Sequence, residues 1–286
     1  MTSSIPQTRW LTKKLARKTV AIGSWLTGSL AASIATDSEP AIRVLTYHRF
    51  GESPRDPFCV STAEFAKQME FLAEQNAAIS LADLDRYLKG QTSLQDSSVV
   101  VTIDDGFRSL YSEALPVLKE FQIPAVAFIT PGLLGHRDIS TEPEPYLTWD
   151  ELSEIADSGI TIGSHAWSHR SLGDLTTEEI RMEAVLSRES LEHHLQRPVD
   201  SFAYPFGTRA DFNKMTADIL KDNGYTYAFT SQHGTIGQGL APYALPRIKV
   251  EGGEGLWLFR LLLRGGLDAW RFVDHTMWKI QARRHG

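Results

Sequence analysis

The chain has a single cysteine, Cys59, among its 286 residues, which excludes an intramolecular disulfide and leaves packing to hold the fold together. It also lacks an uninterrupted apolar run of the ~20 residues that a membrane-spanning helix needs. Basic residues are too few for a general nucleic-acid binder, since 29 Lys and Arg stand against 35 Asp and Glu, giving a net charge of −6. A composition of 42% hydrophobic and 22% charged residues predicts one large globular domain with a buried core.

The charge is distributed unevenly along the chain. The residues before Asp37 include five basic side chains and no acidic one: Arg9, Lys13, Lys14, Arg17 and Lys18. Residues 20–35 follow this cluster with an apolar stretch that ends in small residues, which predicts a secretory signal, with an amphipathic helix on a membrane surface or an unattached extension as the alternatives. We therefore separate residues 1–40, a basic extension, from a central domain over 41–255 and a C-terminal helical extension over 256–286. We favour the interpretation that the apolar stretch after Gly255 covers the bottom of the barrel, with peripheral membrane association through residues 9–35 or 256–278 as the alternative. An exported or membrane-associated protein is favoured over a cytoplasmic one.

From Ala41 onward, short β-type runs alternate with segments of helical period, which is typical of parallel strands joined by crossover helices. Helices are predicted over Thr62–Glu74 and Thr177–Leu195. Seven strands are predicted, at Ile42–Tyr47, Val99–Ile103, Ala125–Thr130, Ile160–Ile162, Ser201–Tyr204, Thr226–Phe229 and Leu245–Val250. The pattern indicates an α/β fold, a distorted (β/α) barrel of about seven parallel strands, with an open doubly wound sheet as the alternative.

Two carboxylates lie where the predicted strand Val99–Ile103 ends. Asp104 and Asp105 are adjacent and are followed by Gly106. Neighbouring carboxylates repel each other, and one of them would hold a proton unless a cation or strong hydrogen-bond donors lie beside it. The pair therefore predicts a metal, although Asp and Gly after a strand are also typical of a plain turn.

Two histidines, His165 and His169, follow the predicted strand Ile160–Ile162. Two imidazoles and one carboxylate form a ligand set typical of catalytic zinc, with positions left open for water and substrate. The separation of four predicts that both rings lie on one side of a helical turn and reach one ion. The plain alternative is a helix start with one buried histidine.

Other polar or turn motifs also follow predicted strands. His48 follows the first strand, and Pro205-Phe206-Gly207 follows the fifth. Because the carboxyl ends of barrel strands meet at the face that carries the chemistry, we expect these residues to gather around Asp104 and His165.

The order and spacing of three motifs resemble those of the polysaccharide deacetylases, the carbohydrate esterase group with the chitooligosaccharide deacetylase homology domain. The motifs are Thr102-Ile103-Asp104-Asp105-Gly106, Ser164-His165-Ala166-Trp167-Ser168-His169 and Phe202-Ala203-Tyr204-Pro205-Phe206-Gly207. The resemblance implies that Asp104 is the catalytic base and that Asp105, His165 and His169 are the metal ligands. It also implies that Pro205, Phe206 and Gly207 form part of the acetyl pocket. We add Tyr204 and Trp167 as substrate-binding residues, Trp167 because its ring can stack on a sugar, although large aromatic residues are more often core.

The chain departs from the family pattern in three places. Ala203 lies where an arginine usually steadies the catalytic aspartate, so Arg247, on another predicted strand, becomes the candidate substitute. A late Asp-and-Trp motif and a late Leu-x-His motif have no counterpart. Instead, Val44-Leu45-Thr46-Tyr47-His48-Arg49 resembles the early Tyr-His segment of the poly-N-acetylglucosamine deacetylase branch, in which that histidine is the general acid. A buried histidine bonded to the backbone is the alternative for His48.

These observations together predict metal-dependent hydrolysis of N-acetyl groups on a glycan. The expected cofactor is a divalent metal, Zn²⁺ first, with Co²⁺, Fe²⁺ and Ni²⁺ as alternatives. The expected partner is an acetylated glycan and no nucleic acid. Two other functions stay open: a catalytically impaired carbohydrate-binding barrel that retains the metal motif, and a metal-dependent phosphoesterase.

Overall fold

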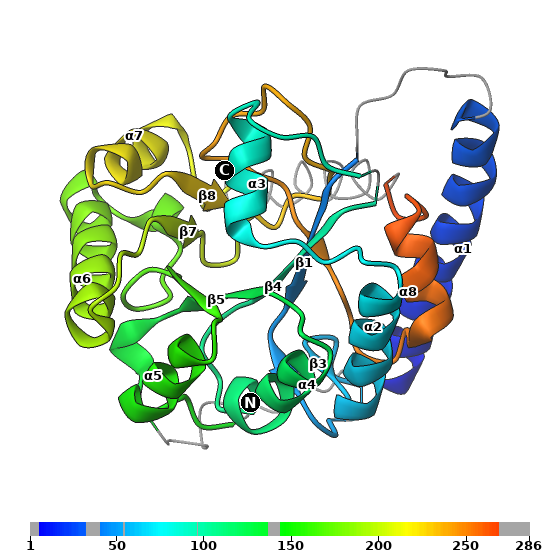
Figure 1. Ribbon diagram of the computed structural model, residues 1–286, viewed down its shortest axis with the longest axis horizontal. Helices are drawn as coiled ribbons and strands as arrows, with labels where there is room; N and C mark the ends of the chain where they lie inside the picture. The colour runs from blue at the N-terminus through cyan, green and yellow to red at the C-terminus, as the bar shows by residue number, and fades with distance from the viewer. Residues whose placement is uncertain (1–5, 33–40, 54, 96, 137–143, 269–286) are drawn as a thin grey trace.

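The computed structural model describes residues 6–32, 41–53, 55–95, 97–136 and 144–268. One curled sheet of seven parallel strands lies at the centre, in the order β8-β7-β6-β5-β4-β1-β9 (Figure 1). Its strands are β1 Arg43–Tyr47, β4 Val99–Ile103, β5 Ala125–Ile129, β6 Thr161–Ser164, β7 Ser201–Ala203, β8 Tyr227–Phe229 and β9 Ile248–Lys249. All seven predicted strands are present, and a small parallel pair, β2 Arg49–Phe50 and β3 Cys59–Val60, was not predicted.

The strand order follows the chain order, which distinguishes this sheet from a doubly wound one. A doubly wound sheet reverses its strand order at a switch point, whereas here each strand after β1 is added on the same side until β8. A sheet built in one direction curls, so that its two faces have different surroundings. Both faces are buried, and for this reason β1 and β4 are buried at every position. The predicted barrel is confirmed as a curled sheet, with a distorted seam between β8 and β9.

Residues 245–249 form that seam. The Leu245 N–H donates to the Ala228 carbonyl at 3.0 Å, and the Thr230 N–H donates to the Leu245 carbonyl at 2.8 Å. Three residues later the same segment pairs with β1, where Ile248 lies opposite Leu45. The chain thus passes from the β8 edge to the β1 edge within a few residues, and Arg247 lies at the crossing.

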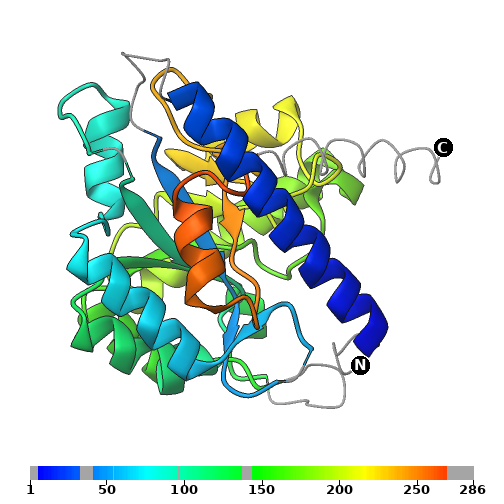
Figure 2. The same cartoon turned by 90° about the vertical axis from the view of Figure 1, so that its right-hand side faces the viewer.

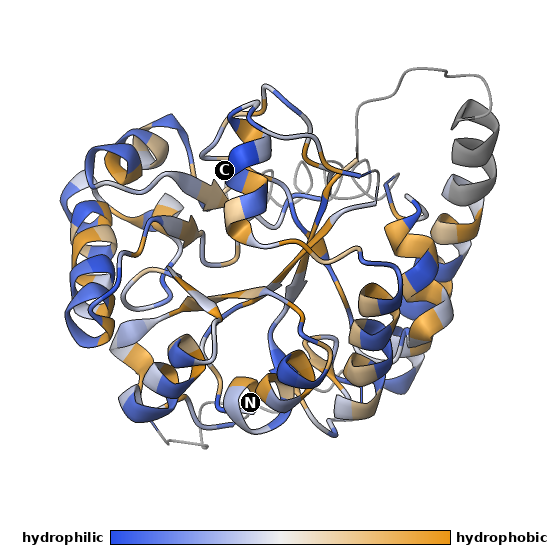
Figure 3. Cartoon of the chain, in the orientation of Figure 1, coloured by the Kyte–Doolittle hydropathy of each residue, from blue (hydrophilic) through white to orange (hydrophobic). Residues whose placement is uncertain are grey.

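Helices surround the sheet: most of them cover its outer face, whereas α3 (Leu81–Leu88) packs against the inner core. Apart from α1, they are α2 Thr62–Glu74, α3 Leu81–Leu88, α4 Leu115–Glu120, α5 Trp149–Asp157, α6 Thr177–Leu195, α7 Lys214–Asp222 and α8 Gly255–Leu263; a π-helical turn at Leu110–Ala114 precedes α4, and 3₁₀ turns lie at Pro131–Leu133 and Leu172–Asp174. The predicted helices α2 and α6 have the predicted bounds. Figure 3 shows both polar and apolar residues on these helices, and their apolar faces build the larger core against the sheet.

A second core fills the inside of the curled sheet. Val44, Val100 and Phe128 contribute to it from the strands, and Leu84 and Tyr87 of α3 pack against the same cluster. Because this core fills the end at which the strands begin, the polar residues that follow the strands collect at the other end.

The helix α1, Gln7–Ala32, runs across α8 (Figure 2). Its contact with the domain is ionic as well as apolar. Lys14 and Arg17 are 6% and 2% exposed, and they pair with Glu251 and Glu254 of the loop after β9. The part of residues 1–40 that the structure describes is therefore a helix docked on the central domain.

None of the described helices combines the length and apolar character needed to cross a bilayer. The predicted C-terminal extension begins with α8, but its later aromatic residues lie outside the described residues, as do residues 33–40. Membrane association through these segments stays a prediction.

Candidate metal centre and active site

The two aspartates lie where β4 ends and the chain turns. The Asp104 N–H still donates to the Tyr47 carbonyl of β1 at 2.9 Å, so Asp104 continues the strand. Asp105 and Gly106 have φ values of 76° and 86° and turn the chain sharply. Glycine suits the second of these positions, whereas a left-handed aspartate is uncommon and marks a constrained residue. The turn separates the two carboxylates and directs them to different partners.

Asp105 meets both histidines of the second motif. Its Oδ1 lies 3.3 Å from Nε2 of His165 and 3.2 Å from Nε2 of His169. One ligand atom from each of the three residues lies within 4.8 Å of the other two. The structure therefore brings together the three residues expected to bind a metal.

The hydrogen bonds around this cluster indicate that a metal cation, and not a shared proton, would best satisfy the atoms of Asp105 and the two histidines that face one another. Nδ1 of His165 lies 2.7 Å from the Ala203 carbonyl, which can only accept, so this nitrogen carries the hydrogen and Nε2 presents a lone pair. That lone pair faces the Asp105 carboxylate. Oδ1 of Asp105 is buried and has no well-oriented hydrogen-bond donor within the described part of the chain. Two lone-pair donors facing each other repel, and a divalent cation among them would remove the conflict.

The loop that carries both histidines is not helical, so the predicted helical turn is wrong. Residues 165–170 follow β6 as an irregular loop, in which Ala166 and His169 have φ values of 62° and 60°. These left-handed residues bring the two rings together, with centroids 5.0 Å apart. The two rings do lie side by side, as the spacing of four suggested, but the geometry that brings them together is that of a loop.

Glu183 of α6 holds this loop and was not anticipated. Its carboxylate accepts hydrogen bonds from the N–H groups of Trp167 and Ser168, at 2.8 and 2.9 Å, and from the Ser168 hydroxyl at 2.5 Å. The side chain is only 6% exposed. The signal in the sequence was a carboxylate on the apolar face of a predicted helix, beside Ile180 and Ala184. Charged residues are almost never buried without a partner.

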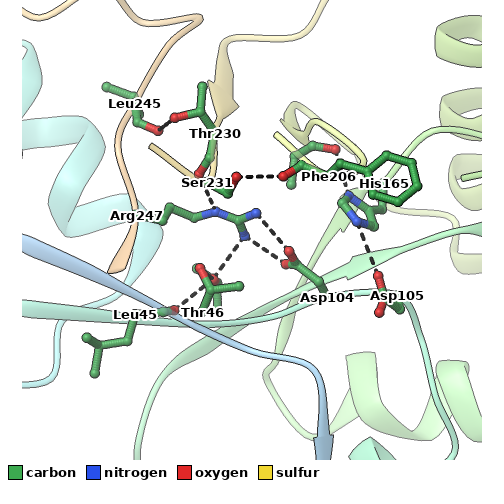
Figure 4. Close-up of polar contacts among 12 residues, drawn as sticks. Leu45, Thr46, Asp104, Asp105, His165, Phe206, Thr230, Ser231, Leu245 and Arg247 are labelled. Atoms are coloured by element: carbon green, nitrogen blue, oxygen red, sulfur yellow. Dashed lines mark hydrogen bonds and ion pairs between the residues drawn. The ribbon is translucent and has the colours of Figure 1, made fainter. Parts of the chain in front are cut away.

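Asp104 is paired with Arg247, as the missing arginine at position 203 suggested. Two parallel hydrogen bonds of 2.7 Å join Nη1 to Oδ1 and Nη2 to Oδ2 (Figure 4). The guanidinium also donates to the Thr230 carbonyl at 3.0 Å and to the Thr102 hydroxyl at 3.2 Å, so its plane is fixed. Burial raises the pKa of Asp104, but Arg247, His165 and His48 together outweigh burial and hold the pKa below its usual value. The carboxylate is thus ionised at neutral pH.

His48 lies at the end of β1, next to the aromatic ring of Phe58. The two ring centroids are 5.0 Å apart in an edge-to-face contact. Nδ1 of His48 is buried and has no hydrogen-bond partner among the described residues. Burial lowers the pKa of His48 to about 4, against the opposing charges of Asp105 and Asp104. The His48 imidazole therefore interacts electrostatically with both aspartates, and it is neutral at pH 7.

The third motif is divided between the core and the surface. Tyr204 is buried, stacked on Phe212, and its hydroxyl donates to the Tyr243 carbonyl at 3.1 Å. Its side chain therefore packs in the outer core and leaves only its backbone for the predicted substrate-binding role. Phe206 is 57% exposed, and its ring lies 5.0 Å from that of His169.

Pro205 is buried, and Gly207 permits a close approach between two loops. A Cβ at Gly207 would lie 2.5 Å from the Ser231 nitrogen. The Ser231 N–H donates to the Gly207 carbonyl at 2.9 Å, and this bond ties the turn to the loop after β8. Trp167 is half-buried, with its indole against Gly132. Of the predicted substrate-binding residues, Phe206 has the most exposed ring beside the cluster.

Comparison with known proteins agrees with this site. Residues 91–228 match the family model of polysaccharide deacetylases. The chain is 28% identical over 203 residues to the poly-beta-1,6-N-acetyl-D-glucosamine N-deacetylase of Staphylococcus epidermidis, covering 68% of each protein. It is 25% identical over 251 residues to the enzyme of the same name from Escherichia coli, covering 74% of this chain but only 37% of that protein.

A solved structure, IcaB from Ammonifex degensii, is 26% identical and superimposes with a TM-score of 0.66, over 80% of this chain and 98% of the other. The segment that matches the family model, residues 91–228, contains Asp104, Asp105, His165, His169 and the Pro-Phe-Gly turn. The strands β1 and β9 lie outside this segment and complete the sheet next to β4. The chain is therefore similar, over a segment just under half of its length, to the polysaccharide deacetylases, and the relatives named above are N-deacetylases, which are hydrolases.

Proposed function

We propose that this protein is a metal-dependent N-deacetylase, which hydrolyses the acetamido group of an N-acetylhexosamine glycan to acetate and a free amine. The observation that carries the proposal is the convergence of Asp105, His165 and His169 beside an ionised, arginine-held Asp104. The names of the Staphylococcus and Escherichia relatives support the same reaction and the same class of glycan.

The three ligands would hold a divalent ion, with Zn²⁺ as the first candidate and Co²⁺, Fe²⁺ or Ni²⁺ as alternatives. Such an ion, when bound, supplies Lewis acidity toward the amide carbonyl and lowers the pKa of water toward ~7. The chain supplies the remaining groups. Asp104 is ionised at neutral pH and accepts the proton of the attacking water, while Arg247 keeps its carboxylate in one orientation.

The departing nitrogen has to be protonated. We propose that this proton comes from the side of the site where His48, the candidate general acid, lies. The exposed ring of Phe206, beside His169, is placed to contact the sugar or its acetyl group. An aromatic surface next to a polar cluster is a common feature of carbohydrate sites because sugar rings present apolar faces.

The two other functions are less well supported by this arrangement. A barrel that only binds glycans would not need a buried ion pair holding Asp104, which is 2% exposed. A phosphoesterase needs cationic groups turned toward the phosphate. Arg247, the buried cation that contacts Asp104, is instead committed to that carboxylate through both Nη atoms.

The test separates metal binding from turnover. Asp105→Asn, His165→Gln and His169→Gln should each reduce bound metal, measured by elemental analysis of the purified protein. Asp104→Asn should keep the metal and lose acetate release from N-acetylglucosamine oligomers by at least ~100-fold, which is typical for a general base. Full activity in Asp104→Asn would refute the assigned role. Phosphate release without acetate release would favour the phosphoesterase.

A further inference from the structure

A lysine that the sequence analysis passed over lies at the same end of the barrel. Lys249 ends β9 and lies opposite Thr46 of β1 in the parallel register. Residues paired in this way point to the same face of a sheet, as do residues two apart on one strand. Thr46 contacts the Thr102 hydroxyl, and Arg247 reaches Asp104, so this face is the inside of the barrel. Lys249 therefore points inside, one step nearer the open end than Arg247.

The ammonium group of Lys249 shares an aromatic neighbour with His48. Its Nζ lies 3.2 Å from the centroid of the Phe58 ring, and the same ring contacts His48 edge to face. Phe58 is 40% exposed, so this group of three reaches the surface, and its His48 interacts with the charges of Asp104 and Asp105. Among the described residues, no hydrogen bond or ion pair to Nζ of Lys249 is found. The ammonium is thus held by an aromatic face and keeps its N–H bonds for another partner.

The two groups differ in the pH at which they carry a proton. His48 is neutral at pH 7 and so has no extra proton to give, although a departing amine requires one. Burial lowers the pKa of Lys249 to about 7, with Glu251 opposing the shift. The charged and titratable groups around Lys249 are Glu251 on the following loop, Lys13, Lys14 and Arg17 on α1, Arg247 just before β9 and His48 after β1.

We propose that Lys249 is a second proton donor of the active site and gives its proton to the departing amine at neutral pH. The proposal rests on the N-deacetylase function proposed above. In this step an Nζ–H bond of Lys249 breaks, a bond from hydrogen to the substrate nitrogen forms, and the electron pair of the C–N bond goes to that nitrogen. The lysine amine then regains a proton from solvent or from the carboxyl group of Asp104, which took one from water. His48 serves as the donor at lower pH, where its imidazole is charged.

The test compares two leaving groups on the metal-loaded full-length protein. An N-acetylated glycan releases an amine, which needs a proton, whereas 4-nitrophenyl acetate releases a stable phenolate, which does not. Lys249→Met should lower acetate release from N-acetylglucosamine oligomers at pH 7 by about 100-fold and change hydrolysis of 4-nitrophenyl acetate less than twofold. Methylammonium should partly restore the glycan reaction in Lys249→Ala. Lys221→Met, at an exposed lysine of α7, is the matched control and should behave as the wild type.

Equal losses on both substrates would overturn the proposal, because they would indicate a structural role, and so would an unchanged glycan reaction. A second readout does not depend on the glycan. Lysines methylated with ¹³C-formaldehyde titrate in NMR spectra, and the signal absent from Lys249→Met should titrate within about one pH unit of 7; a midpoint near 10 would also refute it. A wild type that releases no acetate from any glycan contradicts the proposed function, and the NMR titration then decides alone whether Lys249 exchanges a proton near neutrality.

Discussion

At the scale of single residues, the buried ion pair of Asp104 and Arg247 joins two segments that are distant in sequence. The arginine expected two residues before Pro205 is an alanine, and Arg247 reaches Asp104 from the opposite side of the seam. The exchange is possible because Ala203 is small and fully buried in the inner core, where Phe128 also lies. The Arg247 guanidinium lies 5.5 Å from the ring of Phe128 in the same inner core. The Ala203 carbonyl meanwhile orients His165. One position thus serves both halves of the site.

Removal of Arg247 tests this pair directly. Arg247→Met leaves a carboxylate that is 2% exposed without its partner, and breaking a buried pair in this way costs about 3–5 kcal/mol. We expect the free energy of unfolding, measured in urea, to fall by that amount, and acetate release by folded protein to fall at least ~10-fold with bound metal unchanged.

The double variant Asp104→Asn/Arg247→Met should recover part of the lost stability, since it removes both charges. Arg181→Met is the matched control, because Arg181 forms an exposed ion pair on α6 and should change stability by less than ~0.5 kcal/mol. A loss of metal from Arg247→Met would contradict the separation between the base and the metal ligands.

At the scale of elements, the site depends on segments that are held from outside the sheet. Glu183 of α6 fixes the loop of the two histidines. The helix α1 contacts the loop after β9, and the Arg17 guanidinium donates to the Lys249 carbonyl at 3.2 Å. In both cases a buried charged residue, Glu183 of α6 or Arg17 of α1, lies on a helix that contributes no residue to the metal cluster. The helix and the loop are distant in sequence, so only the folded chain reveals their pairing.

The contact of α1 with the domain predicts a pH dependence of stability. Burial would raise the pKa of Glu251, but Arg17, Lys14 and other cations lower it to about 2. Because the folded pKa lies below the unfolded value, this carboxylate stabilises the fold fully above about pH 4.5, and its contribution is lost as the pH falls toward 2. A shift of this size corresponds to about 3 kcal/mol.

Glu251→Gln should remove this component. Urea unfolding at several pH values between 2 and 7 should show a smaller loss on acidification for Glu251→Gln than for the wild type, with lower stability at pH 7. Glu178→Gln, at an exposed residue of α6, should titrate as the wild type does. Parallel curves for Glu251→Gln and the wild type would show that these ion pairs do not hold α1.

At the scale of the whole molecule, the barrel and most of the site were predictable because they depend on local patterns. Runs such as Val99–Ile103 are apolar without alternation, as strands buried on both faces must be, and four of the predicted strands are followed by a polar or turn motif at the same sheet edge. The seam was not predictable, because one bridge at Leu245 and two pairs on β9 close it. Because position 203 is an alanine and not an arginine, the sequence indicated Arg247 as a candidate partner of Asp104. Its two hydrogen bonds to Asp104, however, depend on the passage of residues 245–249 from the β8 edge to the β1 edge. The left-handed backbone conformations of Ala166 and His169 likewise could not be predicted from the four-residue spacing of the histidines.

Metal removal provides a test that involves the whole fold. The candidate ligands come from two places, the turn after β4 and the loop after β6, so an ion bound to them would join segments that are 60 residues apart in sequence. A ligand that binds only the folded state stabilises it by mass action, by about 2.7 kcal/mol at a free concentration of 100 times Kd. We expect a chelator to lower the unfolding temperature and the unfolding free energy of the wild type, and added Zn²⁺ to restore them.

Two aspartate variants give this experiment its internal control. Asp104→Asn keeps all three candidate ligands and should still respond to chelator and Zn²⁺. Asp105→Asn loses the carboxylate that both imidazoles face, so its unfolding temperature should not change with either treatment. The two variants make the same chemical change at neighbouring positions, and only their places relative to the histidines differ. An equal response in both variants would mean that the ion binds elsewhere, and the assignment of Asp105 as a ligand would have to be abandoned.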